Sequence, residues 1–399
     1  MAHTVVYYHR LDLPSESGQT IQVLRDYHAL ANLNEWVHLF YRGLKPLSEG
    51  ETAKILQNHG LEPCPTLSFH FIAGGLLGRH RMWKGARTLL SSTALPSIVV
   101  CRTMDHAVSA LSIRRSLRHR PVKVLLELHE TAIPHLVYRE QGRIVRAALS
   151  RVREKAVFNQ VDGIIATVRS QVALLEQLYP LRAPVAVLPN AVPSDAFKPC
   201  HPQRTITESA RIHLRYAGQL SPWKNTNIMI ESLRFLPAGV VLDIAGGKVE
   251  KENATRDSLL RHAADLGVHD RVNYVGFLQP KDVPAFLAGG DILLLPLGDN
   301  VRSRYFTCPL KLFEYAAVGV PMVVTRQPTT ASLIEDSSQA LMVEPCSARA
   351  IGEAVSRLLS DPALARTLAA NAKAWAAQYT SDKRASRLRD FLGLITRSA

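Results

Sequence analysis

The most specific chemical pattern of the chain lies at residues 304–321, Arg-Tyr-Phe-Thr-Cys-Pro-Leu-Lys-Leu-Phe-Glu-Tyr-Ala-Ala-Val-Gly-Val-Pro. Pro309 suits the first turn of a helix, where a missing backbone N–H costs nothing. The N–H groups of Leu310 and Lys311 would then point outward at the positive end of the helix dipole, an arrangement that binds phosphate. Glu314, one turn further on, could accept hydrogen bonds from the two hydroxyls of a ribose. The same periodicity also fits an amphipathic core helix with a solvated glutamate.

A second basic residue, Lys224, stands in the segment 216–225, Tyr-Ala-Gly-Gln-Leu-Ser-Pro-Trp-Lys-Asn, between an expected strand and an expected helix. A lysine there can act as a point charge against a diphosphate. Gln219 of the same segment can donate a hydrogen bond but cannot offset charge. Because exposed loop lysines are common, these residue types alone also fit a solvated loop.

Two candidates in the first half of the chain follow expected strands. Gly18 lets the backbone approach a ligand closely and precedes a helix whose first N–H groups lack intrahelical acceptors. A turn glycine beside a capping Ser17 accounts for the same residues. His129 stands at the carboxyl end of the apolar run 123–128, and a lone histidine is more often structural. In open parallel sheets, however, ligands bind beyond the carboxyl ends of the strands.

Short apolar, β-branched runs alternate with helical patterns along the whole chain. Many runs are apolar at consecutive positions, which is typical of parallel strands covered on both faces. Alternating strands and helices imply right-handed crossovers, and two such sets imply two doubly wound, Rossmann-like α/β domains. The expected strands are 4–8, 36–41, 97–101, 123–128, 163–167, 185–188, 212–216, 240–244, 272–275, 292–295, 321–324 and 340–343.

A chain of 399 residues is long enough for about two or three domains. The polar segment 193–211 lacks a sustained period and is the expected boundary. We therefore expect an N-terminal domain at 1–195, a second domain at 196–380 and a last helix at 381–399. That helix either stays with the second domain or crosses back to the first. Ser347, Asp361 and Ser381 are the expected helix caps.

The formal net charge of +14 is concentrated in residues 79–155, which hold 16 Lys and Arg against 5 acids. Such a surface attracts a lipid surface, a polyanion or a nucleotide, or simply aids solubility. The apolar run Phe69–Leu77 followed by His80–Lys84 favours docking on an anionic membrane. A nucleic acid is not expected, because the basic stretches lack interleaved aromatic residues.

Several classes of protein are disfavoured. The chain starts without a leader-like segment, and its longest apolar run, Phe71–Gly78, is far short of the roughly 20 residues that cross a bilayer. We expect a cytoplasmic protein, with a peripheral position on the inner face of the membrane as an option. Five scattered cysteines indicate reduced thiols and no zinc site. Walker, Gly-x-Gly-x-x-Gly and Gly-x-Ser-x-Gly motifs are missing. No cofactor and no metal are expected, since lysines and a helix N-terminus can neutralise a diphosphate.

Residues 308–315, Cys-Pro-Leu-Lys-Leu-Phe-Glu-Tyr, closely resemble the donor-site helix of the group-one retaining glycosyltransferases with the GT-B fold. They differ from one subgroup of that family only at Cys308, where the subgroup has Ser. Many members carry a first Glu at the position that Phe306 occupies here. The resemblance implies two domains that face each other across a cleft, with a nucleoside-diphosphate sugar on the C-terminal domain.

The same resemblance assigns roles to individual residues. It places Glu314 on the ribose, and the Leu310 and Lys311 N–H groups after Pro309, together with Lys224, on the diphosphate. Gln219 stands where the family usually has a diphosphate-binding Arg. The backbone near Phe277 would meet the base. Gly18 would face the donor phosphate and the acceptor, and His129 would contact the donor sugar or the acceptor. The segment 189–197 resembles the family's Pro-Asn-Gly-Val…Phe segment near the interdomain junction, with Asn190 at a turn and Ala191 for Gly.

The expected function is transfer of a hexosyl group from a nucleoside-diphosphate sugar to a glycan or lipid-linked acceptor. The family implies retention of configuration, with the leaving phosphate helping to deprotonate the acceptor in a closed, dry cleft. The alternatives are a GT-B epimerase, which would need paired carboxylates, a non-catalytic relative suggested by Phe306 and Gln219, and a basic polyanion- or nucleic-acid-binding protein.

Overall fold

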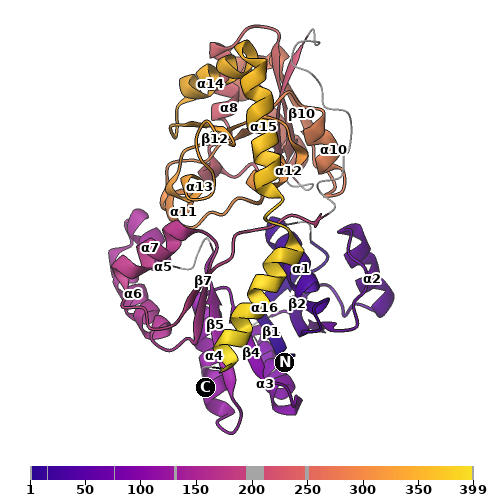
Figure 1. The fold of residues 1–399 in the computed structure, drawn as a ribbon, viewed down its shortest axis with the longest axis vertical. Coiled ribbons are helices and arrows are strands. Elements are labelled where there is room, and N and C mark those ends of the chain that lie inside the picture. The colour runs from indigo at the N-terminus through magenta and orange to yellow at the C-terminus, as the bar shows by residue number, and fades with distance from the viewer. Residues whose placement is uncertain are drawn as a thin grey trace. The chain divides into compact units, whose positions relative to one another are not determined.

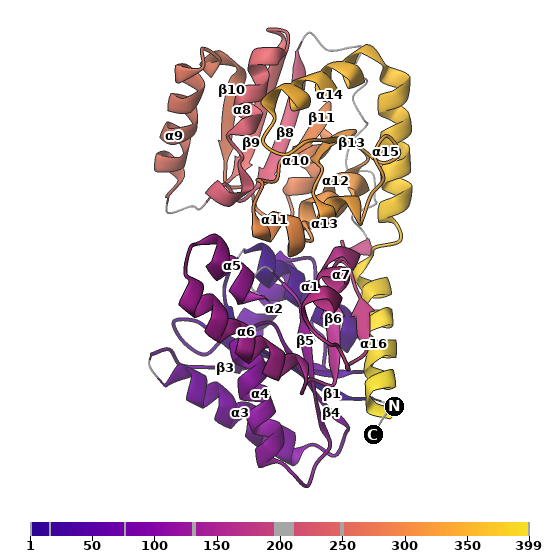
Figure 2. The same cartoon turned by 90° about the vertical axis from the view of Figure 1, so that its left-hand side faces the viewer.

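A computed structural model describes residues 2–15, 17–75, 77–129, 133–194, 211–247 and 251–397. The chain forms two compact units, which Figures 1 and 2 trace. The first comprises Met1–Ala191, Tyr305–Cys308 and Ser381–Ala399, and the second comprises Val192–Arg304 and Pro309–Thr380. Most of the expected boundary 193–211, with Phe197, lies outside the described residues.

The first unit is built on a seven-stranded sheet in the order β3-β2-β1-β4-β5-β6-β7, and every pairing in it is parallel. Its strands are β1 Thr4–Asp12, β2 Trp36–Arg42, β3 Leu67–Phe71, β4 Ser97–Cys101, β5 Val122–Glu127, β6 Gly163–Ala166 and β7 Val185–Val187. Its helices are α1 Gly18–Ala31, α2 Glu49–Asn58, α3 Gly78–Ser92, α4 Met104–Ser116, α5 Pro134–Glu140, α6 Ile144–Phe158, α7 Arg169–Leu178 and α16 Ser381–Arg397.

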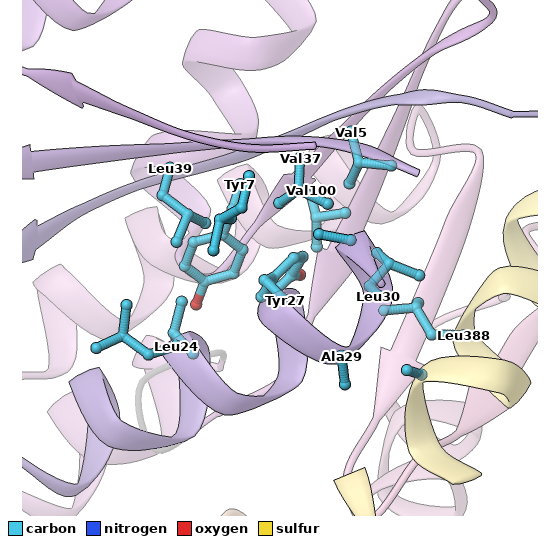
Figure 3. Close-up of a cluster of buried hydrophobic side chains, with 14 of the residues drawn as sticks. Val5, Tyr7, Leu24, Tyr27, Ala29, Leu30, Val37, Leu39, Val100 and Leu388 are labelled. Carbon is cyan, nitrogen blue, oxygen red and sulfur yellow. The ribbon is translucent and has the colours of Figure 1, made fainter. Parts of the chain in front are cut away.

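The core of this unit lies between the sheet and α1, as Figure 3 shows. Tyr7 of β1 and Tyr27 of α1 are fully buried, with ring centroids 4.5 Å apart. Helix α16 joins the same core through Leu388. A Cβ built on Gly163 of β6 would lie 2.9 Å from Ile395 Cδ1, so glycine lets α16 pack closely over the sheet. The last helix of the chain is therefore an integral part of the first unit.

The second unit has a six-stranded sheet in the order β10-β9-β8-β11-β12-β13, again with parallel pairings throughout. Its strands are β8 Ile212–Gly218, β9 Val240–Gly246, β10 Val272–Gly276, β11 Ile292–Leu295, β12 Met322–Thr325 and β13 Leu341–Val343. Its α-helices are α8 Ile228–Ser232, α9 Glu252–Asp265, α10 Val283–Ala288, α11 Val301–Tyr305, α12 Leu310–Val318, α13 Pro328–Ala331, α14 Ala348–Ser360 and α15 Pro362–Ala376. Short 3-10 turns also occur, among them η3 Pro222–Lys224 after β8.

The expectation of two parallel-sheet α/β domains is confirmed. Ser347 and Asp361 cap α14 and α15 as expected, accepting hydrogen bonds from the N–H groups of Ala350 and Leu364. Ser381 is itself the first residue of α16. None of the described helices combines the length and the hydrophobicity that crossing a bilayer requires.

Part of the apolar surface expected at Phe69–Leu77 and His80–Lys84 is packed inside the protein. Phe69 and Phe71 belong to β3, a strand that the sequence analysis missed, and pack against the core. Met82 of α3 is buried, and the indole N–H of Trp83 donates to Ser112 Oγ at 2.8 Å. Phe69, Phe71 and Met82 thus pack against the protein's own interior, whereas Leu77 of the same apolar run is 61 % exposed. Membrane docking through this segment stays a prediction.

Candidate functional site

In the second unit the strand order reverses between β8 and β11, and ligands of open parallel sheets bind beyond the strand ends at such a point. Strand β8 ends at Gly218, whose φ is 151°. A Cβ on Gly218 would lie 1.7 Å from Lys311 Cε and 1.9 Å from Lys311 Nζ. Only glycine therefore leaves room for the Lys311 side chain to lie across the end of β8. The Lys311 ammonium also lies 5.6 Å from the ring centroid of Tyr216.

Helix α12 brings Lys311 to this position. It begins at Leu310, and Pro309 precedes it as the N-cap with extended backbone. The expectation that Pro309 lies inside the first turn is wrong by one residue, while the N–H groups of Leu310 and Lys311 do lie in that turn. The hydroxyl of Tyr315 accepts a hydrogen bond from Ala217 N–H at 3.1 Å, which holds α12 against β8. Glu314, half-buried, stands one turn from the start of the helix.

The loop after β8 carries Gln219 and Lys224 at the same end of the sheet. The Gln219 side chain is exposed, and its carbonyl accepts a hydrogen bond from the Tyr216 hydroxyl at 2.7 Å. Lys224 lies in η3, with its ammonium 5.0 Å from the Trp223 ring centroid. The Trp223 carbonyl accepts a hydrogen bond from Asn300 Nδ2, beyond β11, at 2.7 Å. The structure thus places Lys224 and Lys311 on segments that leave or face the end of β8.

Phe277 is the donor-site candidate placed farthest across this sheet. It follows β10 at the sheet edge, and β9 lies between β10 and β8. Gly276, just before it, has a φ of 88°, and a Cβ there would meet a Glu252 carboxylate oxygen. The backbone conformation just before Phe277 therefore requires glycine at position 276.

In the first unit the strand order reverses between β1 and β4, and Gly18 is the first residue of α1 there. Ser17 caps this helix by accepting a hydrogen bond from Thr20 N–H at 3.2 Å. The next side chain, Gln19, is hydrogen-bonded to the ring of His9, which lies within β1. The rings of His9 and His106 approach to 3.3 Å between their Nδ1 atoms. Sequence reasoning missed both histidines. His9 directly follows the expected strand 4–8, so the strand-end rule that selected His129 would have found it, whereas His106 lies inside α4.

His129 is 8 % exposed just beyond β5, and its Nε2 lies 3.4 Å from Glu127 Oε2. We call His9, His106 and His129 the histidine cluster. Burial, aided by the Arg102 guanidinium, lowers the pKa of His129 to about 4. Burial and the neighbouring His106 lower the pKa of His9 to about 3, and burial lowers that of His106 to about 4. All three imidazoles are therefore neutral at pH 7 and can exchange hydrogen bonds with hydroxyl groups.

Arg384 of α16 enters the interior next to this cluster. Its guanidinium lies 3.0 Å from Asp26 Oδ2 and 2.7 Å from Glu127 Oε1, and its Nε donates to the Pro189 carbonyl at 3.1 Å. Burial opposes the ionisation of Glu127, but His129, Arg384 and Arg102 hold the pKa of Glu127 below its ordinary value. Burial raises the pKa of Asp26 to about 6. No sequence signal pointed to Arg384, which pairs with Glu127, the carboxylate that faces His129.

Phe306 does not lie on α12. It is buried, it belongs to the segment Tyr305–Cys308 of the first unit, and its carbonyl accepts a hydrogen bond from Gln171 Nε2 at 3.4 Å. Asn190 Nδ2 donates to the Cys308 carbonyl at 2.5 Å, and burial raises the pKa of the Cys308 thiol to about 12. This segment is thus an apolar and hydrogen-bonded part of the first unit's interior. Among the described residues no three His, Cys, Asp or Glu side chains form a group that could hold a metal ion.

Two parallel α/β domains with switch points of this kind are typical of the GT-B fold, and solved structures of that fold match 98 to 100 % of the chain. The sucrose-phosphate synthase of Thermosynechococcus elongatus superposes with a TM-score of 0.82 at 18 % identity, covering 100 % of both chains. HepE of Anabaena in complex with UDP superposes with a TM-score of 0.74 at 15 % identity, covering 98 % of this chain and 100 % of HepE. The chain therefore has the GT-B fold.

Sequence comparison narrows this class. Residues 202–375 match the family described as glycosyl transferases group 1. The D-inositol 3-phosphate glycosyltransferase of Xylanimonas cellulosilytica is 24 % identical over 268 residues, 64 % of this chain and 61 % of that protein. A GDP-mannose-dependent alpha-(1-6)-phosphatidylinositol monomannoside mannosyltransferase of Mycobacterium tuberculosis is 27 % identical over 229 residues. These residues are 53 % of this chain and 56 % of that protein. The match thus spans 56–61 % of the length of these two curated relatives. The comparisons support the group 1 glycosyltransferase family that residues 308–315 resemble.

Proposed function

We propose that this chain is a glycosyltransferase that moves a hexosyl group from a nucleoside-diphosphate sugar to a glycan or lipid-linked acceptor. The observation that carries the proposal is the Lys311 side chain laid across Gly218 at the end of β8. It puts a cation and the N-terminus of α12 together at the switch point of the second unit. A diphosphate is the ligand that such a pairing of charge and backbone N–H groups suits.

The donor chemistry follows from these groups. The bond between the sugar's anomeric carbon and the diphosphate breaks, a new bond forms to the acceptor oxygen, and the acceptor proton passes to the leaving diphosphate. The diphosphate gains negative charge as it departs, and Lys311, Lys224 and the start of α12 stabilise that charge. Glu314 accepts hydrogen bonds from the ribose hydroxyls. Retention of configuration and front-face attack are inferred from the family resemblance. We propose no metal and no cofactor for this reaction.

We assign acceptor binding to the first unit, at Gly18 and His129. A neutral His129 can accept or donate a hydrogen bond to a sugar hydroxyl without introducing charge. By their names, the two relatives act on inositol 3-phosphate and on a phosphatidylinositol mannoside. The second of these acceptors is a lipid, which favours a role in glycolipid or envelope-polysaccharide synthesis, with this protein peripheral on an anionic inner membrane face.

A thermal-shift screen against UDP, GDP, ADP, TDP and their hexose conjugates tests the donor site. A nucleotide that binds only the native state, at a free concentration of about 100 times its Kd, raises the free energy of unfolding by about 2.7 kcal/mol. We expect the nucleotides of one base to raise the melting temperature. Glu314→Ala and Lys224→Ala should each abolish that rise. The matched controls Glu353→Ala and Lys281→Ala, exposed residues of the same unit, should keep it. No shift with any nucleotide would refute the proposal and favour a polyanion-binding protein, and a shift without sugar transfer would indicate a non-catalytic relative.

The configuration of the product tests retention separately. With the stabilising donor and a candidate lipid-linked acceptor, proton NMR of the new glycosidic linkage gives its anomeric configuration. We expect the configuration of the donor to be kept, and an inverted product would contradict the retaining assignment without affecting the donor site.

A further inference from the structure

Helix α6 exposes an unusual amount of apolar surface. Ile144, Val145, Leu149 and Val152 are 62, 76, 69 and 72 % exposed. Eleven large apolar side chains of the described residues are exposed, and four of them lie on this one helix. A contiguous exposed apolar patch marks an interaction site more often than scattered residues do. The stripe is defined here by Val145, Leu149 and Val152, spaced four and three residues apart along one face of the helix.

The opposite face of α6 is anchored, so the stripe cannot rotate inward. Glu154 is completely buried and its carboxylate accepts hydrogen bonds from His135 N–H at 2.8 Å, from Ser150 Oγ at 2.9 Å and from the Tyr179 hydroxyl at 2.6 Å. Ala147, Val157 and Phe158 are also buried. At 3.6 residues per turn these residues project away from the stripe. Figure 2 shows α6 alongside α5, one of the helices against which it packs.

Cations border the stripe on both sides. Arg146 and Arg153 follow one edge and Arg151 and Lys155 the other, and all four are exposed. Arg146 lies over the Tyr138 ring at 4.9 Å, and Arg153 pairs with Asp105. The one acid of α6, Glu154, faces inward. The outward surface of the helix is therefore apolar along its middle and positively charged along its edges.

We propose that α6 is the element by which the first unit docks on an anionic phospholipid surface. The helix lies parallel to the bilayer plane, with the stripe at the acyl boundary and the four cations at the lipid phosphates. This inference rests on the lipid-linked acceptor of the proposed function, and it replaces the expected docking segment at 69–84 with a different element.

Charge favours this occupant over others. A second copy of α6 would bring its own four cations against these four, which repel one another. An anionic bilayer instead carries charge opposite to the four cations. A nucleic acid would engage the cations but would leave the apolar stripe exposed, since the helix offers no aromatic side chain on which bases stack.

Co-sedimentation of the full chain with vesicles tests the proposal. The probes are mixed phosphatidylglycerol–phosphatidylcholine vesicles and pure phosphatidylcholine vesicles at low ionic strength. We expect binding to the mixed vesicles only, reduced at least tenfold in Leu149→Gln/Val152→Gln and about tenfold or more in Arg151→Gln/Lys155→Gln. Two controls should bind like the parent: Leu44→Gln, which removes an exposed apolar side chain elsewhere, and Arg81→Gln/Lys84→Gln on α3.

Three results would overturn the proposal. They are failure of the parent to bind anionic vesicles, unchanged binding in both α6 variants, and loss of binding in the α3 variant instead. Light scattering on the same samples detects the competing occupant: a dimer of the parent that Leu149→Gln/Val152→Gln converts to monomer would assign the stripe to a second copy. Nucleotide-induced stabilisation of each variant separates this test from the donor site. Failed docking with an intact nucleotide shift refutes only the role of α6, whereas vesicle binding without any nucleotide shift refutes the proposed function.

Discussion

Arg384 and Glu127 lie 257 residues apart in the sequence, and Arg384 Nη2 lies 2.7 Å from Glu127 Oε1 in the interior of the first unit. The same guanidinium pairs with Asp26, and all three side chains are buried. One cation from the C-terminal helix therefore compensates two carboxylates, one of which faces His129. Without α16 the unit would retain two buried negative charges and lose the group that positions Glu127.

Replacement of Arg384 by Met should be severely destabilising. Removing one partner of a buried ion pair costs about 3–5 kcal/mol, because the remaining charge is left uncompensated. Urea unfolding monitored by circular dichroism measures the change. Arg387→Met, at an exposed position of the same helix, should change the free energy of unfolding by less than about 0.5 kcal/mol. A loss below about 1 kcal/mol for Arg384→Met would show that the pairing is not what stabilises this interior.

Gly218→Ala should abolish nucleotide binding. The added methyl group would occupy the place of Lys311 Cε and Nζ, and a φ of 151° disfavours any residue with a Cβ. Because the end of the lysine side chain can move aside, the fold should survive with a loss of about 1–2 kcal/mol. Isothermal titration with the stabilising nucleotide measures the affinity.

Gly267→Ala is the matched control for Gly218→Ala. Gly267 also has a positive φ, of 70°, but a Cβ there meets nothing within 4 Å. Gly267→Ala should therefore lose a similar amount of stability through backbone strain and leave the nucleotide affinity unchanged. Equal affinities of the two variants would show that the Lys311 position is not needed for binding.

Phe306→Glu should destabilise the protein rather than supply the acid that the family commonly has there. Phe306 is 2 % exposed, and an unpaired buried carboxylate costs on the order of several kcal/mol. Thermal unfolding of this variant is compared with Phe306→Leu, which keeps an apolar side chain and should cost about 1.5 kcal/mol or less. A Phe306→Glu variant as stable as the parent and more active would show that the side chain reaches the donor.

The free energy of unfolding should fall as the pH drops from about 6.5 towards 4. The histidine cluster has pKa values of about 3 to 4 in the native state, against 6.5 when unperturbed. Between these values the unfolded chain binds more protons, so the stabilisation is complete above pH 6.5 and is lost on acidification. Asp26, with its pKa raised to about 6, acts in the opposite direction between pH 3.8 and 6.

His129→Gln should make that pH dependence less steep. One fully titrating group changes the free energy of unfolding by about 1.4 kcal/mol per pH unit, so we expect the slope between pH 6 and 5 to fall by about 1 kcal/mol per unit. Urea titrations at half-unit intervals measure it. The exposed His119 provides the control, since His119→Gln should leave the slope unchanged. An unchanged slope in His129→Gln would mean that this imidazole is not held neutral.

Much of the fold could be predicted because buried parallel strands are apolar at consecutive positions. The expected strands 97–101 and 292–295 coincide with β4 and β11. Strand β3 was missed because Leu-Ser-Phe-His-Phe alternates at a sheet edge and adjoins an apolar run. The strand-end rule likewise selected Gly18, His129, Gln219 and Lys224 as candidates, since it depends only on where strands end.

The sequence by itself determined the alternation of strands and helices and the two α/β domains. It also singled out Cys308–Tyr315 as the segment with the most specific chemical pattern. Only the tertiary structure decided which side chains meet. Local periodicity carries no information on contacts between distant segments, such as Lys311 across Gly218 or Arg384 between Asp26 and Glu127. Nor does it tell which side of an apolar helix is covered. The buried Glu154 and its hydrogen bonds set the rotation of α6, and that rotation alone leaves Val145, Leu149 and Val152 facing solvent.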